Sequence, residues 1–180
     1  MNCLQYPLEI NTILRKKKYI KKELLKSKNL IEKNIAILGG STTSEVKNIL
    51  ELFLLKNEIK PIFYESEYNK FYEDSLFETE ELNSFKPDII YIHTTNVNII
   101  NYPELEDDKD KIDELLKSEL EKFKSIWGAL SKYDCAIIQN NFDLPFHRSL
   151  GNLDGYDIHG KTNFINKLNI KFAKQAEEIN

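Results

Sequence analysis

Four short apolar runs, each containing isoleucine, constrain the fold of this chain more than any other feature of its sequence. They are IAIL at 35–38, PIFY at 61–64, DIIYIH at 88–93 and CAIIQ at 135–139. None of them alternates between apolar and polar residues, as a strand with one solvent-facing side would. Continuous apolar runs are typical of strands buried on both faces, which occur in parallel sheets covered by helices. The runs therefore predict a parallel sheet.

The stretches between these runs have the periodicity of helices. Apolar residues recur every three or four positions after the first run, before the fourth run and near the C-terminal end. Strands that alternate with helices are typical of a doubly wound α/β fold. We predict a three-layer α/β/α sandwich, flavodoxin-like, with strands in the order 2-1-3-4. A further helix is expected at 11–28, and the long loop at 140–160 has room for an additional strand.

Length and composition fit one domain with a substantial core, since the chain has 180 residues and 41% of them are hydrophobic. The net charge of −4 gives no general attraction for nucleic acid. No apolar run reaches 18 residues, so no membrane insertion is expected, and the first ten residues lack the order of a signal peptide. Cys3 and Cys135 lie far apart in the sequence, and Cys135 is inside an apolar stretch. This pattern is typical of reduced, unpaired thiols in a cytosolic protein. We expect a cytoplasmic protein.

Charge is distributed unevenly along the chain. The segment at 15–28 is strongly basic, whereas the segment at 104–114 is strongly acidic. A basic helix can contact phosphate groups or a membrane surface, but such runs are more often solvated helix faces. Both interpretations stay open for a basic helical extension at 1–32, which precedes the α/β domain at 33–180.

Ligands of doubly wound sheets bind beyond the carboxyl ends of the strands. This rule selects four loops: GGSTT at 39–43, ESEYN at 65–69, TTNVN at 94–98 and the segment 140–160. The last is long, rich in Gly, Asn and Asp, and without a clear period, which is typical of functional or disordered loops. The three histidines of the chain, His93, His147 and His159, lie in or beside these loops.

The first of these loops raises the question of what Ser41 does. Gly39 and Gly40 permit a tight turn, and Thr42 with Glu45 fits a capping box that would start a helix near Thr42 or Ser41. Ser41 is then a capping hydroxyl, a nucleophile whose own N–H helps to hold an oxyanion, or part of a phosphate-binding turn. The lysine of a P-loop is missing, which argues against a nucleoside triphosphate.

A serine nucleophile needs a base, and the long loop contains two imidazoles. Asp157 precedes His159 by two residues, so a carboxylate is available to orient that ring. His147 is the alternative base, and each histidine is also compatible with a surface position without function, His147 more so than His159. Asn96 either donates to an oxyanion or satisfies its own backbone. No metal site is expected, because these histidines lack the close ligand spacing of a zinc site.

The GGS, TTN and DIH blocks occur in the order found in the SGNH (GDSL-like) hydrolase superfamily, which this chain resembles. The resemblance implies that Ser41 is the nucleophile, Asn96 an oxyanion donor and His159 the base. Gly40 stands where that superfamily has the aspartate of its Gly-Asp-Ser block.

A closer resemblance extends over nearly the whole chain. The stretches ILGGSTTSEV, FYESEYNKFYEDSL, FKPDIIYIHTTN and IIQNNFDLPFHRSLGNLDG, with TNFINKLN after them, are similar to the N-terminal domain of FkbH-like proteins. In these members of haloacid-dehalogenase (HAD) superfamily IIIC, an SGNH-like domain precedes a phosphatase-like HAD domain. That second domain carries an Asp-x-Asp motif at a strand end, and none of the strands expected here ends in one. The chain is therefore expected to correspond to the N-terminal domain.

The FkbH-like family is associated with moving a glyceryl unit from an acyl phosphate onto acyl carrier protein. The resemblance implies acyl transfer or ester hydrolysis on a carrier-bound substrate, or a catalytically inactive module that positions substrate or carrier for the HAD domain. A third reading is a scaffold that docks through its basic helix.

The partners implied are an acyl carrier protein or small acyl substrate and the HAD domain. No cofactor is implied for this segment, because Mg²⁺ would belong to the HAD domain. The residues expected to contact substrate or oxyanion are Gly40, Glu65, Ser66, Tyr68, Asn69, Asn96 and His147.

Overall fold

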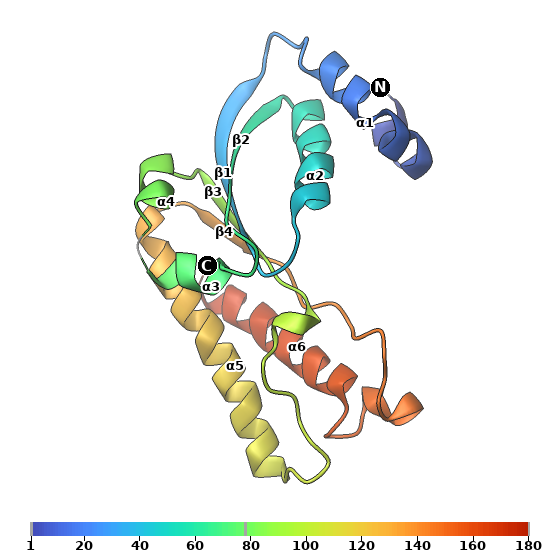
Figure 1. Cartoon of the computed structure of the whole chain (residues 1–180), viewed down its shortest axis with the longest axis vertical. Coiled ribbons are helices and arrows are strands. Elements are labelled where there is room, and N and C mark those ends of the chain that lie inside the picture. The colour runs from blue at the N-terminus through green and yellow to red at the C-terminus, as the bar shows by residue number, and fades with distance from the viewer. Residues whose placement is uncertain (1, 78, 180) are drawn as a thin grey trace.

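Four parallel strands form one sheet in the order β2-β1-β3-β4 (Figure 1). The strands are β1 (Ile31–Gly39), β2 (Ile59–Glu65), β3 (Ile89–His93) and β4 (Ala136–Gln139). Each contains most of one predicted apolar run. The structure is a computed structural model that describes residues 2–77 and 79–179. The predicted three-layer α/β/α fold and its strand order are confirmed.

The main hydrophobic core lies between the sheet and four helices, α3 (Phe71–Leu76), α4 (Glu80–Phe85), α5 (Lys109–Leu130) and α6 (Lys161–Ile179). Strand β1 supplies this core with Ala36 and Leu38, while the alternating Ile35 and Ile37 are also buried. Successive side chains of a strand point to opposite faces. The first strand is therefore buried on both faces, as its unalternating sequence predicts.

The opposite face of the sheet is covered by α2 (Ser44–Lys56) over β1 and β2. A second cluster joins Leu52 of α2 to Ile13 and Ile20 of α1 (Ile10–Leu24) and to the short helix η1 (Asn2–Leu4). Helix α1 thus packs on the outside of α2. The helix was predicted at 11–28. It begins one residue earlier, at Ile10, and ends four residues earlier, at Leu24.

The remaining elements are short. They are η2 (Asn96–Asn98), η3 (Ser131–Tyr133) and η4 (Gly151–Gly155). The segment 140–160 contains η4 but no strand, so the sheet ends at β4. Within the described residues, no helix is long and apolar enough to cross a membrane.

Candidate functional site

The parallel register brings the carboxyl ends of β1, β2 and β3 together. Gly39 lies beside His93 of β3, and the N–H of Gly40 donates to the His93 carbonyl oxygen at 2.8 Å. Ser41 follows as a partly buried residue of the turn. The predicted loops GGSTT, ESEYN and TTNVN therefore meet at one edge.

The predicted capping box of Thr42 and Glu45 is wrong. Helix α2 begins at Ser44 with Thr43 as its N-cap residue, and no side chain caps its N–H groups. The buried Thr43 hydroxyl instead donates to Glu65 Oε1 at 2.6 Å. Because the Thr43 hydroxyl bonds to Glu65 at the end of β2, it does not cap the helix. The first N–H groups of α2 therefore have no side-chain acceptor among the described residues.

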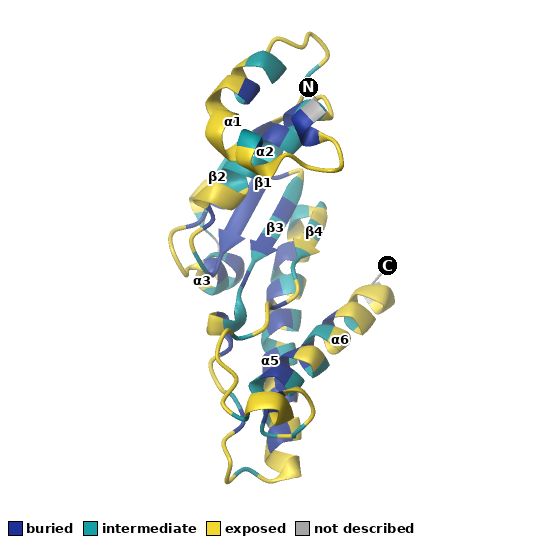
Figure 2. Ribbon diagram, turned by 90° about the vertical axis from the view of Figure 1, so that its right-hand side faces the viewer, coloured by how far each residue is buried: buried dark blue, intermediate teal, exposed yellow. Residues whose placement is uncertain are grey.

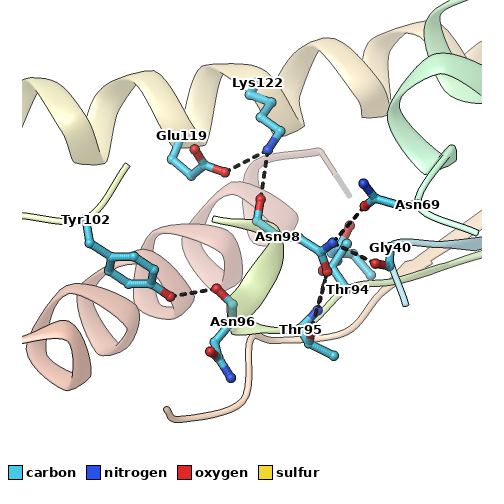
Figure 3. Close-up of polar contacts among 10 residues, drawn as sticks. Gly40, Asn69, Thr94, Thr95, Asn96, Asn98, Tyr102, Glu119 and Lys122 are labelled. Atoms are coloured by element: carbon cyan, nitrogen blue, oxygen red, sulfur yellow. Dashed lines mark hydrogen bonds and ion pairs between the residues drawn. The ribbon is translucent and has the colours of Figure 1, made fainter. Parts of the chain in front are cut away.

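Asn98 is the residue that organises this turn (Figure 3). Its side-chain Nδ2 donates to the carbonyl oxygen of Gly40 at 2.7 Å and to Oδ1 of Asn69 at 3.1 Å. Its Oδ1 accepts from the N–H of Thr95 at 2.8 Å. Asn98 is 8% exposed, and a Cβ atom on Gly40 would come within 2.6 Å of its Oδ1. Asn98 therefore occupies the space beside Gly40. An aspartate at position 40, as in the Gly-Asp-Ser block of SGNH hydrolases, would clash with it.

The sequence interpretation selected Asn96 and missed Asn98. Asn96 contacts a different loop, because its N–H donates to Asp143 Oδ1 at 2.7 Å and its Nδ2 donates to Asp143 Oδ2 at 2.9 Å. Its carbonyl oxygen accepts from the hydroxyl of Tyr102 at 2.7 Å (Figure 3). Thr95 and Asn98 form a capping box around η2. The Thr-x-x-Asn spacing is a sequence signal for this local box, whereas the bond from Asn98 to Gly40 leaves no such signal.

An ion pair from α5 supports the η2 turn. Lys122 Nζ donates to the backbone carbonyl oxygen of Asn98 at 3.2 Å and to Glu119 Oε1 at 2.9 Å (Figure 3). Its ammonium group also lies 5.4 Å from the ring centroid of Phe123. Glu119 is 6% exposed, and a carboxylate at such a depth needs a partner of opposite charge. The pair fixes the backbone from which the Asn98 side chain reaches Gly40.

The end of β2 supplies polar contacts from the second predicted loop. Burial alone would raise the pKa of Glu65, but hydrogen bonds from Lys47 and Thr43 outweigh it and hold the pKa below its ordinary value. The buried Ser66 hydroxyl accepts from the N–H of Gly39 at 2.8 Å. These contacts join β2 to the Gly39–Gly40 turn.

The other three residues of that loop, Glu67, Tyr68 and Asn69, are exposed. Tyr68 is 73% exposed. Asn69 has φ 59°, in the left-handed region, and its side chain reaches Asn98. Asn69 thus belongs to the Gly40 cluster, and a substrate role for Tyr68 stays a prediction.

His159 pairs with Asp157 as the sequence suggests, with Nδ1 2.9 Å from Asp157 Oδ1. Its Nε2 lies 3.0 Å from the backbone carbonyl oxygen of Asp107. Both oxygens accept hydrogen bonds and neither donates, so both contacts are hydrogen bonds only when the ring is protonated. The Asp107 carbonyl, followed by Asp157, raises the pKa of His159. No contact joins His159 to Ser41 among the described residues, and its role as base stays a prediction.

The other histidines have different surroundings. His147 is exposed, with its ring edge-on to Phe146 at 5.0 Å between centroids. His93 Nδ1 lies 2.8 Å from the hydroxyl of Tyr91, and burial lowers the pKa of His93. Neither has a described contact with Ser41.

The NLDG motif holds the start of α6. The buried Asp154 accepts from the N–H of Thr162 in the first turn of the helix at 2.8 Å. A Cβ atom on Gly160 would come within 2.1 Å of the Asp154 carbonyl oxygen. The NLDG motif, which is one of the stretches similar to FkbH-like proteins, therefore caps the start of α6 through Asp154.

Chemically, the edge offers backbone donors, amides and a paired carboxylate. Within residues 2–77 and 79–179, no group of three or more His, Cys, Asp or Glu residues is arranged to hold a metal ion. Helix α2 begins three residues after Ser41, and its first N–H groups, which the Thr43 side chain does not cap, attract anions and carbonyl oxygens. The arrangement suits binding of an acyl or anionic group.

Comparisons with known proteins point to one solved structure. No protein-family model and no curated protein matches the sequence. The fold is similar to the crystal structure of the N-terminal part of BF1531 from Bacteroides fragilis, which contains a phosphatase domain and is complexed with Mg. The TM-score is 0.69, with 17% identity. The two chains share a fold. The match covers 90% of this chain and 42% of that one, so this chain spans less than half of its length.

Proposed function

We propose that this chain is a substrate-positioning domain that works beside a phosphatase domain. In this proposal it binds an acyl group, free or attached to acyl carrier protein, at the Gly40–Ser41 turn. Two observations support the pairing with a phosphatase domain: the sequence resembles FkbH-like proteins, and the fold is similar to part of a protein that contains such a domain. Mg²⁺ would then act in the partner domain.

The observation that carries the proposal is that the first N–H groups of α2, which begins three residues after Ser41, have no side-chain cap. The first N–H groups of an α-helix have no acceptor within the helix, and the Thr43 side chain is turned to Glu65. Carbonyl and carboxylate oxygens bind well to such groups. Because Asn98 already fixes the Gly40 carbonyl, the turn is ordered before a ligand arrives.

Positioning is favoured over attack because of the state of His159. A general base must have a free lone pair within reach of the serine proton. Both nitrogens of His159 instead face acceptor oxygens, of Asp157 and Asp107. In this arrangement the ring has no lone pair to offer Ser41.

Acyl transfer or ester hydrolysis by Ser41 is the second candidate. One observation favours it, namely that Ser41 lies in the same turn as the free N–H groups, which would hold the oxyanion of a tetrahedral intermediate. Ser41 Oγ would attack the acyl carbonyl, and His159, oriented by Asp157, or else His147 would take its proton. The same imidazole would pass this proton to the departing alcohol or thiol as the ester or thioester bond breaks, and water or an acceptor hydroxyl would then take the acyl group from Ser41. This scheme requires the long loop to bring an imidazole to Ser41.

One titration tests both candidates. Butyryl-N-acetylcysteamine, a small acyl thioester, is added to the ¹⁵N-labelled protein while thiol release is followed. Positioning predicts shifts of the Gly40, Ser41 and Ser44 amides without thiol release, retained in Ser41→Ala and lost in Asn98→Ala. Catalysis predicts release that Ser41→Ala abolishes. The exposed Asn29→Ala is the control, and the absence of both shifts and release contradicts both candidates.

A further inference from the structure

Helix α1 has a basic side that faces away from the rest of the protein. The segment 15–28 contains eight basic residues and one acidic residue. Two of its lysines attach the helix to α2: Lys17 pairs with Glu45 and Lys21 with Glu51, with Nζ to Oε2 distances of 2.7 Å in both pairs. These ion pairs fix which side of α1 faces the protein, so the opposite side faces outward.

Most of the remaining basic residues are free. Five are exposed and have neither an ion pair nor a side-chain hydrogen bond to any described residue: Arg15, Lys16, Lys18, Lys22 and Lys28. Successive residues of an α-helix are about 100° apart, so Arg15, Lys18 and Lys22 form one stripe on the side opposite the buried Ile13 and Ile20. Figure 2 shows α1 at one end of the molecule, with its outer side exposed. The charge of this stripe is therefore available to a partner.

Apolar side chains are interspersed with these charges. Leu14 and Leu25 flank the stripe on one side and Tyr19 on the other, with exposed fractions of 49%, 40% and 62%. Tyr6, which precedes the helix, is 95% exposed. Helices that lie on a membrane surface combine lysine or arginine with such residues, and tyrosine is enriched at the membrane–water interface. Solvation of the helix explains the lysines and leaves these apolar side chains unexplained.

The opposite end of the molecule is acidic. The segment 104–114 contains seven acidic and two basic residues. It leads into the start of α5, which lies at the far end of the long axis from α1 (Figure 1). The whole chain has a net charge of −4, so an anionic surface would attract the α1 end and repel the other end. Such a charge distribution favours a single orientation on a flat anionic surface.

We propose that α1 binds the surface of an anionic lipid bilayer, with Arg15, Lys18 and Lys22 at the headgroups and Leu14 and Tyr19 between them. Each lysine or arginine near such a surface strengthens association about fivefold. The attraction extends over one Debye length, about 8 Å at physiological ionic strength, which the exposed side chains satisfy. Four of the five free charges are lysines, which lack the planar fork that arginine uses for a carboxylate. A bilayer therefore suits this side better than an acidic protein.

Cosedimentation with large unilamellar vesicles tests the proposal. The whole chain is mixed, at about 0.15 M salt, with vesicles of phosphatidylcholine alone or with about 30% phosphatidylserine. One triple variant removes the stripe and leaves Lys17 and Lys21 to hold α1 on α2: Arg15→Ala, Lys18→Ala and Lys22→Ala. The control variant has the same net charge and loses exposed lysines of α5 and α6: Lys117→Ala, Lys171→Ala and Lys174→Ala. Circular dichroism checks that both variants are folded.

Wild type is expected to bind the vesicles that contain phosphatidylserine and not those of phosphatidylcholine alone. The stripe variant should bind about 100-fold more weakly, because three charges are lost at about fivefold each, and the control variant should bind like wild type. Equal binding to both kinds of vesicle would overturn the proposal. Equal weakening in the two variants would overturn it as well, since only net charge would then matter.

A tryptophan in place of Tyr19 distinguishes a lipid surface from an acidic protein. The emission of Tyr19→Trp, compared with wild type in which Trp127 is the one tryptophan, should move to the blue with phosphatidylserine vesicles, because the indole enters an apolar layer. Soluble poly-glutamate, which offers charge without that layer, should leave it unchanged. A shift with poly-glutamate and none with vesicles would assign α1 to an acidic protein and overturn the proposal.

Discussion

The side-chain amide of Asn98 donates to the carbonyl oxygen of Gly40 at 2.7 Å, across 58 residues of sequence. This bond joins the turn after β1 to the turn after β3. It holds the backbone on which Ser41 and the start of α2 depend. The account of the site therefore predicts strong effects from small changes at either residue.

Gly40→Ala should destabilise the protein, because the added Cβ would lie 2.6 Å from Asn98 Oδ1. We expect the free energy of unfolding to fall by about 1–3 kcal/mol, the usual effect of overpacking. Gly128→Ala is the matched control, since a Cβ there meets nothing within 4 Å; it should stabilise helix α5 by about 0.5–1 kcal/mol. Urea unfolding measures both. Equal effects of the two changes would disprove the close contact.

Asn98→Ala should leave the Gly40 carbonyl and the Thr95 N–H without their partners. Each buried group that loses its hydrogen bond costs about 1–3 kcal/mol, so unfolding experiments should show a loss of at least that size. Asn96→Ala, which breaks only the contact of a half-exposed side chain with Asp143, should cost less than about 1 kcal/mol. A larger loss for Asn96→Ala than for Asn98→Ala would reverse our assignment.

Protonated His159 should stabilise the fold in a pH-dependent way. The Asp107 carbonyl and Asp157 raise its pKa in the folded protein above the ordinary value near 6.5. The stabilisation is complete below the unfolded pKa and is lost as pH rises through the folded pKa. Wild type should therefore lose stability relative to His159→Gln as pH rises above about 6.5.

Urea titrations at several pH values, with an NMR titration of the imidazole, check this expectation. His147→Gln, at an exposed position, is the matched control substitution. A His159 pKa at or below its ordinary value would show that the ring is not held by Asp107 and Asp157.

Gly160→Ala should weaken the start of α6. A Cβ at this position would come within 2.1 Å of the Asp154 backbone oxygen, so the backbone must shift and the Asp154–Thr162 hydrogen bond would be disturbed. We expect a loss of about 2–4 kcal/mol in thermal or urea unfolding. Gly155→Ala meets no atom within 4 Å and should change stability by less than about 1 kcal/mol.

Strand β1 was predictable from sequence because burial on both faces leaves a local record. Ile35 to Leu38 are all buried, so the run has no polar interruption, and the helices between the runs determine that neighbouring strands are parallel. The same expectation was wrong for the edge strands β2 and β4, in which Ile62 is 42% and Ile138 is 51% exposed. The start of α2 was not predictable in the same way. The N-cap residue Thr43 donates a hydrogen bond to Glu65 of β2. This tertiary contact replaces the local capping box that the spacing of Thr42 and Glu45 predicts.

In the candidate site, too, the sequence predicts local contacts but not contacts between distant segments. The spacing of Asp157 and His159 predicts their contact, which is local. The bond from His159 to the Asp107 carbonyl spans 52 residues, and no pattern in the sequence indicates it. Asn96 and Asn98 both follow β3, and only the path of η2 decides which amide reaches Gly40.

In the proposed function, the Gly40–Ser41 turn positions a ligand and Ser41 is not an activated nucleophile. Fluorophosphonate labelling of the folded protein, read by intact mass beside Ser41→Ala, distinguishes this role from catalysis. We expect no adduct on either protein. A single adduct on wild type that is lost in Ser41→Ala would contradict it and establish Ser41 as a nucleophile.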